Sequence, residues 1–124
     1  MNVVDSSGWL VNFVDGANAD FFARPVQNTG ELLVPTISLC EVFKHVVINR
    51  SEGEALRAVA VMQQGRLIDL DSNIAISAAK ASADLKMPMA DSVMLASARA
   101  NDARLWPQDE DFKDIEGVEY VQKK

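Results

Sequence analysis

Short apolar runs alternate along the chain with longer segments of helical periodicity, and this alternation restricts the fold more than any other feature. Each run is too short for a helix and is typical of a buried strand. The predicted strands cover residues 2–4, 32–34, 67–70, 104–106 and 118–121. Because strands that alternate with helices pair in parallel, the sequence predicts an α/β fold with a mostly parallel central sheet and helices on both faces.

Apolar residues at three- and four-residue spacing predict the helices between these strands. They are expected at residues 9–14, 18–27, 36–50, 54–64, 72–85 and 90–101. Asp15 and Gly16 should stop the first of them, and Gly65 is placed to end the helix at 54–64. No repeat, linker or low-complexity segment interrupts the pattern, so residues 1–124 are expected to form a single domain.

The amino-acid composition is that expected of a soluble globular protein. The chain is 48% hydrophobic and 24% charged, as globular proteins are. It has one cysteine and therefore no internal disulfide, which fits a reducing cytoplasm. No apolar run approaches the roughly 20 residues of a membrane helix, and no basic segment of a signal peptide is visible. We therefore expect a cytoplasmic protein without a membrane partner.

The charge balance restricts the partners. Twelve Lys and Arg residues against 18 Asp and Glu give a net charge of −6. Proteins that hold nucleic acid mainly by charge usually have a basic surplus, so the charge balance argues against a simple phosphate-binding module. An enzyme that approaches phosphates through metal ions remains compatible, because carboxylates are the ligands that hard cations prefer.

Several acids fall where the predicted strands end. Asp5 follows the first strand, and Glu41 lies in the first turns of the helix after the second strand. Asp91 opens the helix that follows Pro88, and Asp109 comes shortly after the strand that ends at Trp106. Ligands of open parallel sheets bind beyond the carboxyl ends of the strands. Clustered carboxylates repel one another unless a cation neutralises them, so the pattern indicates a site for Mg²⁺ or Mn²⁺.

Each of these acids also has a purely structural interpretation. Asp5 could simply end a strand, and Asp91 is a favourable residue for the first turn of a helix. Ser38 and Glu41 have the spacing of a capping box, in which the glutamate bonds only a backbone N–H. The run 109–111 could be a solvated group of charges. The coincidence of all of them at one predicted edge favours the metal site.

Four local motifs contain these acids, in the order VVDSS at 3–7, SLCEV at 38–42, ADSVMLA at 90–96 and LWPQDEDF at 105–112. Together they resemble the successive motifs of PIN domains, and most closely those of the VapC-type toxins of bacterial toxin–antitoxin pairs. The resemblance spans nearly the whole chain and implies a PIN-like three-layer fold. It also implies a metal-dependent endoribonuclease that hydrolyses RNA phosphodiester bonds with a metal-activated water.

The resemblance assigns roles position by position. It implies that the catalytic acids are Asp5, Glu41, Asp91 and Asp109, of which Asp5, Asp91 and Asp109 are the expected ligands of Mg²⁺ or Mn²⁺. Ser7 and Asp111 are expected to support these ligands. Pro107 departs from the family, which usually has Thr or Ser there; proline offers neither a hydroxyl nor an N–H to support Asp109.

The same resemblance implies the partners. These are an RNA substrate (a transfer RNA or a ribosomal RNA loop), a small antitoxin protein and a second copy of the chain in a homodimer. DNA would be reached only through the antitoxin. The helices at 36–50 and 54–64 are expected to form the groove for an antitoxin peptide that places an Arg or Lys among the acids.

Two other interpretations stay open. The chain could be a non-catalytic PIN-like binding domain, or a receiver-like signalling domain with an acidic pocket. A receiver would need an acidic pair after the first strand and an acceptor aspartate after the third, where this chain has only Asp5 and Asp69. Among the remaining residues, Cys40 is expected to be a small buried side chain. His45 and Lys44 are expected on a helix surface.

Overall fold

Four parallel strands form the centre of the protein, in the order β3-β2-β1-β4. The computed structural model describes residues 1–124. The strands are β1 (Asn2–Val4), β2 (Leu32–Pro35), β3 (Arg66–Ile68) and β4 (Arg104–Trp106). In the register, Val3 pairs with Leu33 on one side and with Leu105 on the other. The predicted parallel sheet and four of its five predicted strands are confirmed.

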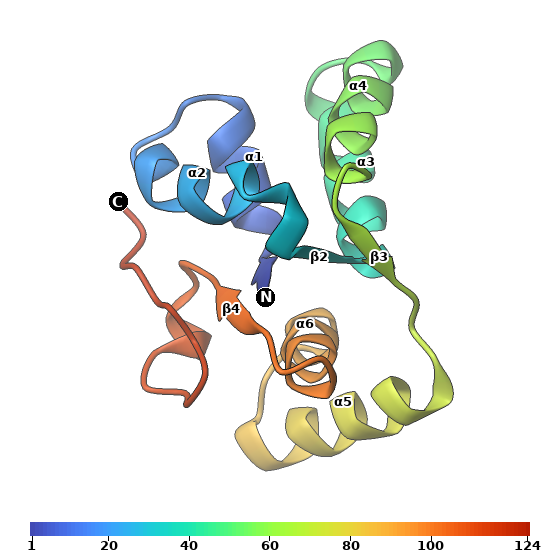
Figure 1. Ribbon diagram of the computed structural model, residues 1–124, viewed down its shortest axis with the longest axis vertical. Coiled ribbons are helices and arrows are strands. Elements are labelled where there is room, and N and C mark those ends of the chain that lie inside the picture. Colours follow the sequence, from blue (N-terminus) through green and yellow to red (C-terminus); the bar gives the residue numbers. More distant parts are fainter.

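Helices cover both faces of the sheet and give three layers (Figure 1). On one face lie α1 (Ser6–Phe13), α2 (Ala19–Gln27), α3 (Thr36–Asn49) and α4 (Glu52–Met62). On the other face lie α5 (Ser72–Leu85) and α6 (Met89–Ala100). Two short 3₁₀ helices, η1 (Thr29–Glu31) and η2 (Glu110–Phe112), complete the chain. The α/β class predicted from the sequence is therefore correct.

The core is divided by the sheet because successive side chains of a strand point to opposite faces. Val3 packs with Met94 and Leu95 of α6, whereas Val4 packs with Trp9 and Phe22 of α1 and α2. All of these side chains are fully or almost fully buried. Both faces of β1 are thus fixed by apolar packing, which holds the end of the strand in place. None of the helices is long and apolar enough to cross a membrane.

The terminal strand predicted at 118–121 is wrong. Only the pair Leu105 and Val118 forms a parallel bridge. The Leu105 N–H donates to the Gly117 carbonyl, and the Leu105 carbonyl accepts from the Glu119 N–H. The next residue of this strand that could pair with the C-terminal segment is Pro107. Proline has no N–H to donate, so the ladder cannot continue as a full pair. Pro107 only accepts a bond from the Val121 N–H, at 3.2 Å.

Helices α1 and α4 differ most from the prediction, by two or three residues at their ends, for local reasons. Helix α1 begins at Ser6 instead of residue 9, because the Asp5 carbonyl already accepts from the N–H groups of Gly8 and Trp9. Helix α4 begins at Glu52, where the Ser51 side chain accepts from the Glu54 N–H at 3.1 Å. It ends at Met62, so Gly65 is not its cap. A Cβ at Gly65 would lie 3.0 Å from the Leu32 carbonyl oxygen, which explains a glycine there.

The contact between α1 and α2 depends on Gly8. A Cβ at this position would lie 2.6 Å from two ring atoms of Phe22 and 2.9 Å from Val4. We expect Gly8→Ala to lower the free energy of unfolding by about 1–3 kcal/mol, the usual cost of overpacking, although alanine is the better helix former. Gly30→Ala is the matched control, since nothing lies within 4 Å of its added Cβ. Denaturant unfolding measures both; equal stability of the two variants would contradict the close approach.

Candidate metal-binding site

The sheet brings the predicted acids to one edge. Asp5 follows β1 directly and is 5% exposed, and Glu41 lies half-buried in α3, which follows β2. Asp91 is in the first turn of α6, half-buried. Asp109 follows β4 and precedes η2, which contains Asp111; both are exposed. Because β4 pairs with β1, Asp109, which follows β4, comes to the same end of the sheet as Asp5.

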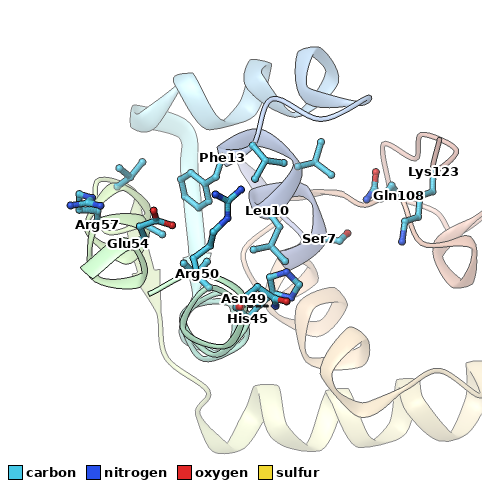
Figure 2. Close-up of a pocket in the computed structure, with 15 residues that line it drawn as sticks. Ser7, Leu10, Phe13, His45, Asn49, Arg50, Glu54, Arg57, Gln108 and Lys123 are labelled. Atoms are coloured by element: carbon cyan, nitrogen blue, oxygen red, sulfur yellow. Dashed lines mark hydrogen bonds between the residues drawn. The ribbon is translucent and has the colours of Figure 1, made fainter. Parts of the chain in front are cut away.

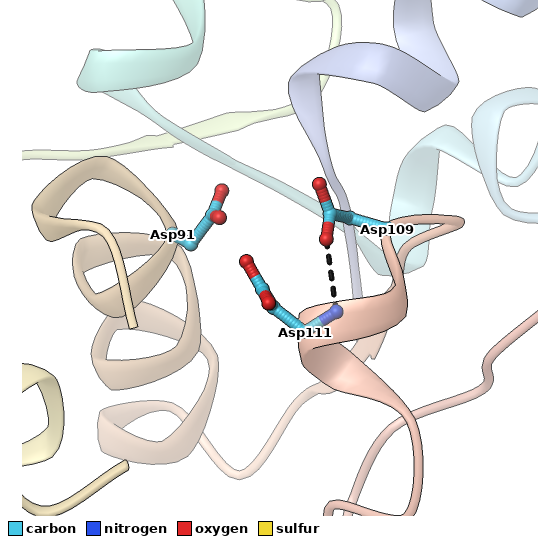
Figure 3. Close-up of side chains that lie close together, drawn as sticks. All are labelled: Asp91, Asp109 and Asp111. Carbon is cyan, nitrogen blue, oxygen red and sulfur yellow. Dashed lines mark hydrogen bonds between the residues drawn. The ribbon is translucent and has the colours of Figure 1, made fainter. Parts of the chain in front are cut away.

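Three carboxylates lie close enough to share one cation. Ligand oxygens of Asp91, Asp109 and Asp111 are all within 4.8 Å of one another (Figure 3). The Asp111 N–H donates to Asp109 Oδ1 at 2.9 Å, which fixes the direction of the Asp109 carboxylate. Asp111 is therefore one of these three carboxylates, whereas Asp5, which is more deeply buried, is not among them.

All five acids are close enough to interact electrostatically. Burial raises the pKa of Asp91 to about 7, helped by repulsion from Asp5, Asp109, Glu41 and Asp111 in that order. Burial likewise raises the pKa of Asp5 to about 6, with smaller contributions from Glu41 and Asp109. The Ser7 hydroxyl opposes this rise by donating a hydrogen bond to the ionised Asp5.

No basic side chain neutralises this group. The ion pairs of the protein join Met1 to Glu31, Lys80 to Asp84 and Arg104 to Glu119, all outside it. Hard divalent cations such as Mg²⁺ take oxygen ligands, usually from one or two carboxylates together with water and substrate phosphate. Crowded carboxylates with raised pKa values and no basic partner have the chemistry of such a site, so these residues fit a divalent metal ion.

Two serines at the start of α1 orient the buried acids. Ser7 Oγ donates to Asp5 Oδ2 at 3.1 Å, and Ser6 Oγ donates to Glu41 Oε1 at 2.7 Å. The resemblance implied that Ser7 supports the metal ligands without naming its partner. The contact of Ser6 was not predicted, although adjacent serines after a strand-ending aspartate were visible in the sequence. The capping box of Ser38 and Glu41 is wrong, because α3 begins at Thr36 and the Ser38 hydroxyl donates to Met94 Sδ.

Asp109 is supported in spite of Pro107. Gln108, only 4% exposed, accepts a 3.0 Å hydrogen bond from the Asn18 amide, which also donates to the Gln122 carbonyl. Asn18 is itself 5% exposed and lies 90 residues away in the sequence. This buried amide pair and the Val121 bond to the Pro107 carbonyl hold the loop before Asp109. Neither Asn18 nor Gln108 was predicted, because only the folded chain brings them together.

Three of the other residues considered from the sequence have clear positions. Cys40 is exposed, so its predicted burial is wrong: Ser38 and Val42 occupy the inward face of α3, and Cys40 lies on another face. His45 and Lys44 are exposed on α3, as expected.

A groove of about 850 Å³ runs between α1 and the hairpin of α3 and α4 (Figure 2). Its apolar lining includes Leu10, Phe13 and Val46, and its basic lining includes Arg50 and Arg57. Ser7, the hydrogen-bond donor to Asp5, belongs to the lining. The groove therefore connects an apolar surface with the acidic site.

The chain belongs to the PIN-domain family, whose model matches residues 3–118. No curated protein sequence matches the chain. Several solved structures share the fold. A toxin–antitoxin complex from Klebsiella pneumoniae has a TM-score of 0.77 at 20% identity and covers 95% of both chains. The DNA-bound VapBC of Salmonella typhimurium has a TM-score of 0.74 at 15% identity, covering 98% of this chain and 96% of its own. The sarcin–ricin loop cleaving toxin VapC20 of Mycobacterium tuberculosis has a TM-score of 0.72 at 13% identity, covering 91% and 92%.

The raised pKa values predict how metal-free protein responds to pH. A carboxyl whose pKa is higher in the folded than in the unfolded state lowers stability as pH rises, here between about 4 and 7. We expect Asp91→Asn to raise the melting temperature relative to the unmodified chain at pH 7.5 in EDTA, and to lose this advantage near pH 4. Mg²⁺ should stabilise the unmodified chain more than the variant.

Glu116→Gln is the control for net charge, since Glu116 is exposed and outside the group. It should shift the melting temperature little and equally at both pH values. If the melting temperature of Asp91→Asn relative to the unmodified chain does not rise with pH, the crowding of charges around Asp91 is contradicted. Calorimetry or circular dichroism melting measures these shifts.

Proposed function

We propose that this protein is a metal-dependent endoribonuclease and the toxin of a type II toxin–antitoxin pair. The principal support is the group of five carboxylates without a basic partner at the carboxyl ends of the strands in a PIN-domain chain. The likeness to structures of VapC toxins, one of them described as a sarcin–ricin loop cleaving toxin, agrees with this function. An RNA substrate and a single free cysteine agree with a cytoplasmic protein.

In this proposal Asp5, Asp91 and Asp109 supply oxygen ligands to Mg²⁺ or Mn²⁺, and Asp111 is equally well placed beside the last two. When bound, the ion lowers the pKa of a water and neutralises charge that develops on the phosphate. Glu41, held by the Ser6 hydroxyl, orients the attacking water or completes the ligands. Ser7 holds Asp5, and the Asp111 N–H holds Asp109. The chain thus contributes placement of charge more than covalent chemistry.

RNA is the favoured substrate. A chain of net charge −6 gains little from releasing the counterions of duplex DNA. Single-stranded loops of folded RNA can extend an unstacked nucleotide towards a recessed site. We therefore propose a transfer RNA or ribosomal RNA loop as the target, with DNA bound only through the antitoxin.

The alternative that remains is a PIN-like domain that binds without cleaving. A receiver-like domain is wrong for this chain, because β3 lies at the outer edge and β2 separates it from β1. Asp69, which follows β3, is therefore not next to Asp5, as an acceptor aspartate would have to be. Metal-dependent cleavage distinguishes the proposal from binding alone.

The partner we propose is a small antitoxin whose peptide lies in the groove between α1 and the hairpin of α3 and α4. The two helices predicted at 36–50 and 54–64 line this groove. Helix α1 lines it as well, and the sequence did not indicate this contribution of α1. An apolar side chain of the peptide would pack on Leu10 and Val46, and an Arg or Lys would reach the acids past Ser7. We further propose that the toxin forms a homodimer.

Asp5→Asn and Asp91→Asn test the catalytic site. Each removes a charged oxygen with little change in volume, so we expect metal-dependent cleavage of RNA to fall by at least about 100-fold. The melting temperature in EDTA should not fall, because ionisation of each acid in the folded state is unfavourable. Cleavage of a folded transfer RNA with and without Mg²⁺ measures the effect. Full activity of both variants would overturn the assigned site, and cleavage of duplex DNA with RNA intact would overturn the substrate.

Val14→Glu tests the groove. Val14 lines it and is 61% exposed, so a charge there should disturb a docked apolar peptide without unfolding the chain. We expect the variant to cleave RNA normally but to lose inhibition by the small protein encoded beside it, with at least about a tenfold weaker affinity. Ile76→Glu on α5, 72% exposed and outside the groove, is the control. Equal binding of both variants would contradict this docking site.

A further inference from the structure

A second cavity opens beside Asp109 and shares Gln108 and Lys123 with the groove between α1 and the hairpin of α3 and α4. It has a volume of about 480 Å³, within the range of about 300–1,000 Å³ that small-molecule sites occupy. Its lining comes from the loop after β4 and from the C-terminal segment. Asp109 belongs both to this cavity and to the carboxylate group, so the two sites are contiguous.

The wall of this cavity is held in place by hydrogen bonds. The C-terminal segment runs along β4, where the Glu119 N–H donates to the Leu105 carbonyl at 2.8 Å. Further along, the Val121 N–H donates to Pro107, and the buried Asn18 amide donates to the Gln122 carbonyl at 3.1 Å. These bonds fix the backbone on both sides of Tyr120, so the cavity is formed before any ligand arrives.

The side chains of the cavity have the chemistry that recognises a nucleotide. Lys113 and Lys123 line it, and neither takes part in an ion pair. Tyr120, the only tyrosine of the chain, is half-buried in the same lining and is paired with no other aromatic ring. Two free ammonium groups beside an acidic centre are notable in a chain with only 12 basic residues. Glu110 is the one acid of the lining besides Asp109.

We propose that this cavity binds one nucleotide of a single-stranded RNA next to the phosphate that is cleaved. The base stacks on Tyr120, and the flanking phosphate lies between Lys113 and Lys123. Aromatic stacking accepts any base and lysine contacts any phosphate, so the cavity positions the strand without reading its sequence. A strand held here passes Asp109 and reaches the carboxylates directly. This inference rests on the proposed ribonuclease function.

Steady-state cleavage of a single-stranded RNA oligonucleotide by the full chain in Mg²⁺ tests the cavity. We expect Tyr120→Ala to raise KM by about 5- to 100-fold, and Tyr120→Phe, which keeps the ring, to leave it unchanged. Lys113→Gln and Lys123→Gln should each raise KM and lower the slope of log affinity against log salt by about 0.7, the value for one lost phosphate contact on a single strand. A residue that only stabilised the fold would not change this slope.

Lys124→Gln is the matched control, since it removes the same charge one residue beyond the cavity. If the unmodified chain cleaves RNA but Lys113→Gln and Lys123→Gln behave like Lys124→Gln, the inference is wrong and the ribonuclease proposal stands. If the unmodified chain does not cleave RNA at all, the proposed function fails first. Lys123 also lines the groove proposed for the antitoxin, whereas Lys113 lines only this cavity of the two. If Lys113→Gln keeps KM but loses affinity for the antitoxin, the cavity belongs to that partner and the nucleotide site is overturned.

Discussion

The partial burial of crowded acids at one end of the sheet is the constraint that the rest of the structure has to accommodate. Five carboxylates meet at one end of the sheet, and burial together with their mutual repulsion raises the pKa values of Asp5 and Asp91. The fold withstands this because apolar packing fixes both faces of β1 and because hydroxyl and N–H groups hold individual carboxylates. Stability is therefore concentrated in the layers around the sheet and is reduced at its carboxyl edge, as is common where function requires strain.

Much of the fold could be predicted from the sequence because its signals are local. The runs at β1, β2 and β4 are short, apolar and followed by helix-forming segments, so the parallel sheet and its layers followed from pattern alone. The failures arise where a distant partner decides the outcome. Pro107 ends the pairing of residues 118–121, an effect that no pattern within that segment reveals. Gly65 has the position of a helix cap, but it is required by the approach of Leu32.

The candidate site was likewise predictable only in part from the sequence. The acids could be predicted because the ends of parallel strands lie at one edge and the motifs appear in the family's order. Their supports could not, since the Ser6 contact with Glu41 crosses 35 residues and the Asn18 contact with Gln108 crosses 90. The position of Asp111 beside Asp91 depends on the turn of η2, which has no sequence signal of its own. Local chemistry thus identified the charged groups, and tertiary contacts determined their arrangement.

The pairing of β1 with β4 also bears on how the protein is made. The first strand of the chain finds one of its two neighbours only after more than a hundred residues have been translated. Contacts between such distant segments form slowly during folding, because a long loop must close first. Asp109 and Asp111 leave the ribosome later still, so a nascent chain first carries Asp5, Glu41 and Asp91 without the other two acids of the group. The complete set of carboxylates therefore comes together only after η2 has been synthesised and β4 has paired with β1.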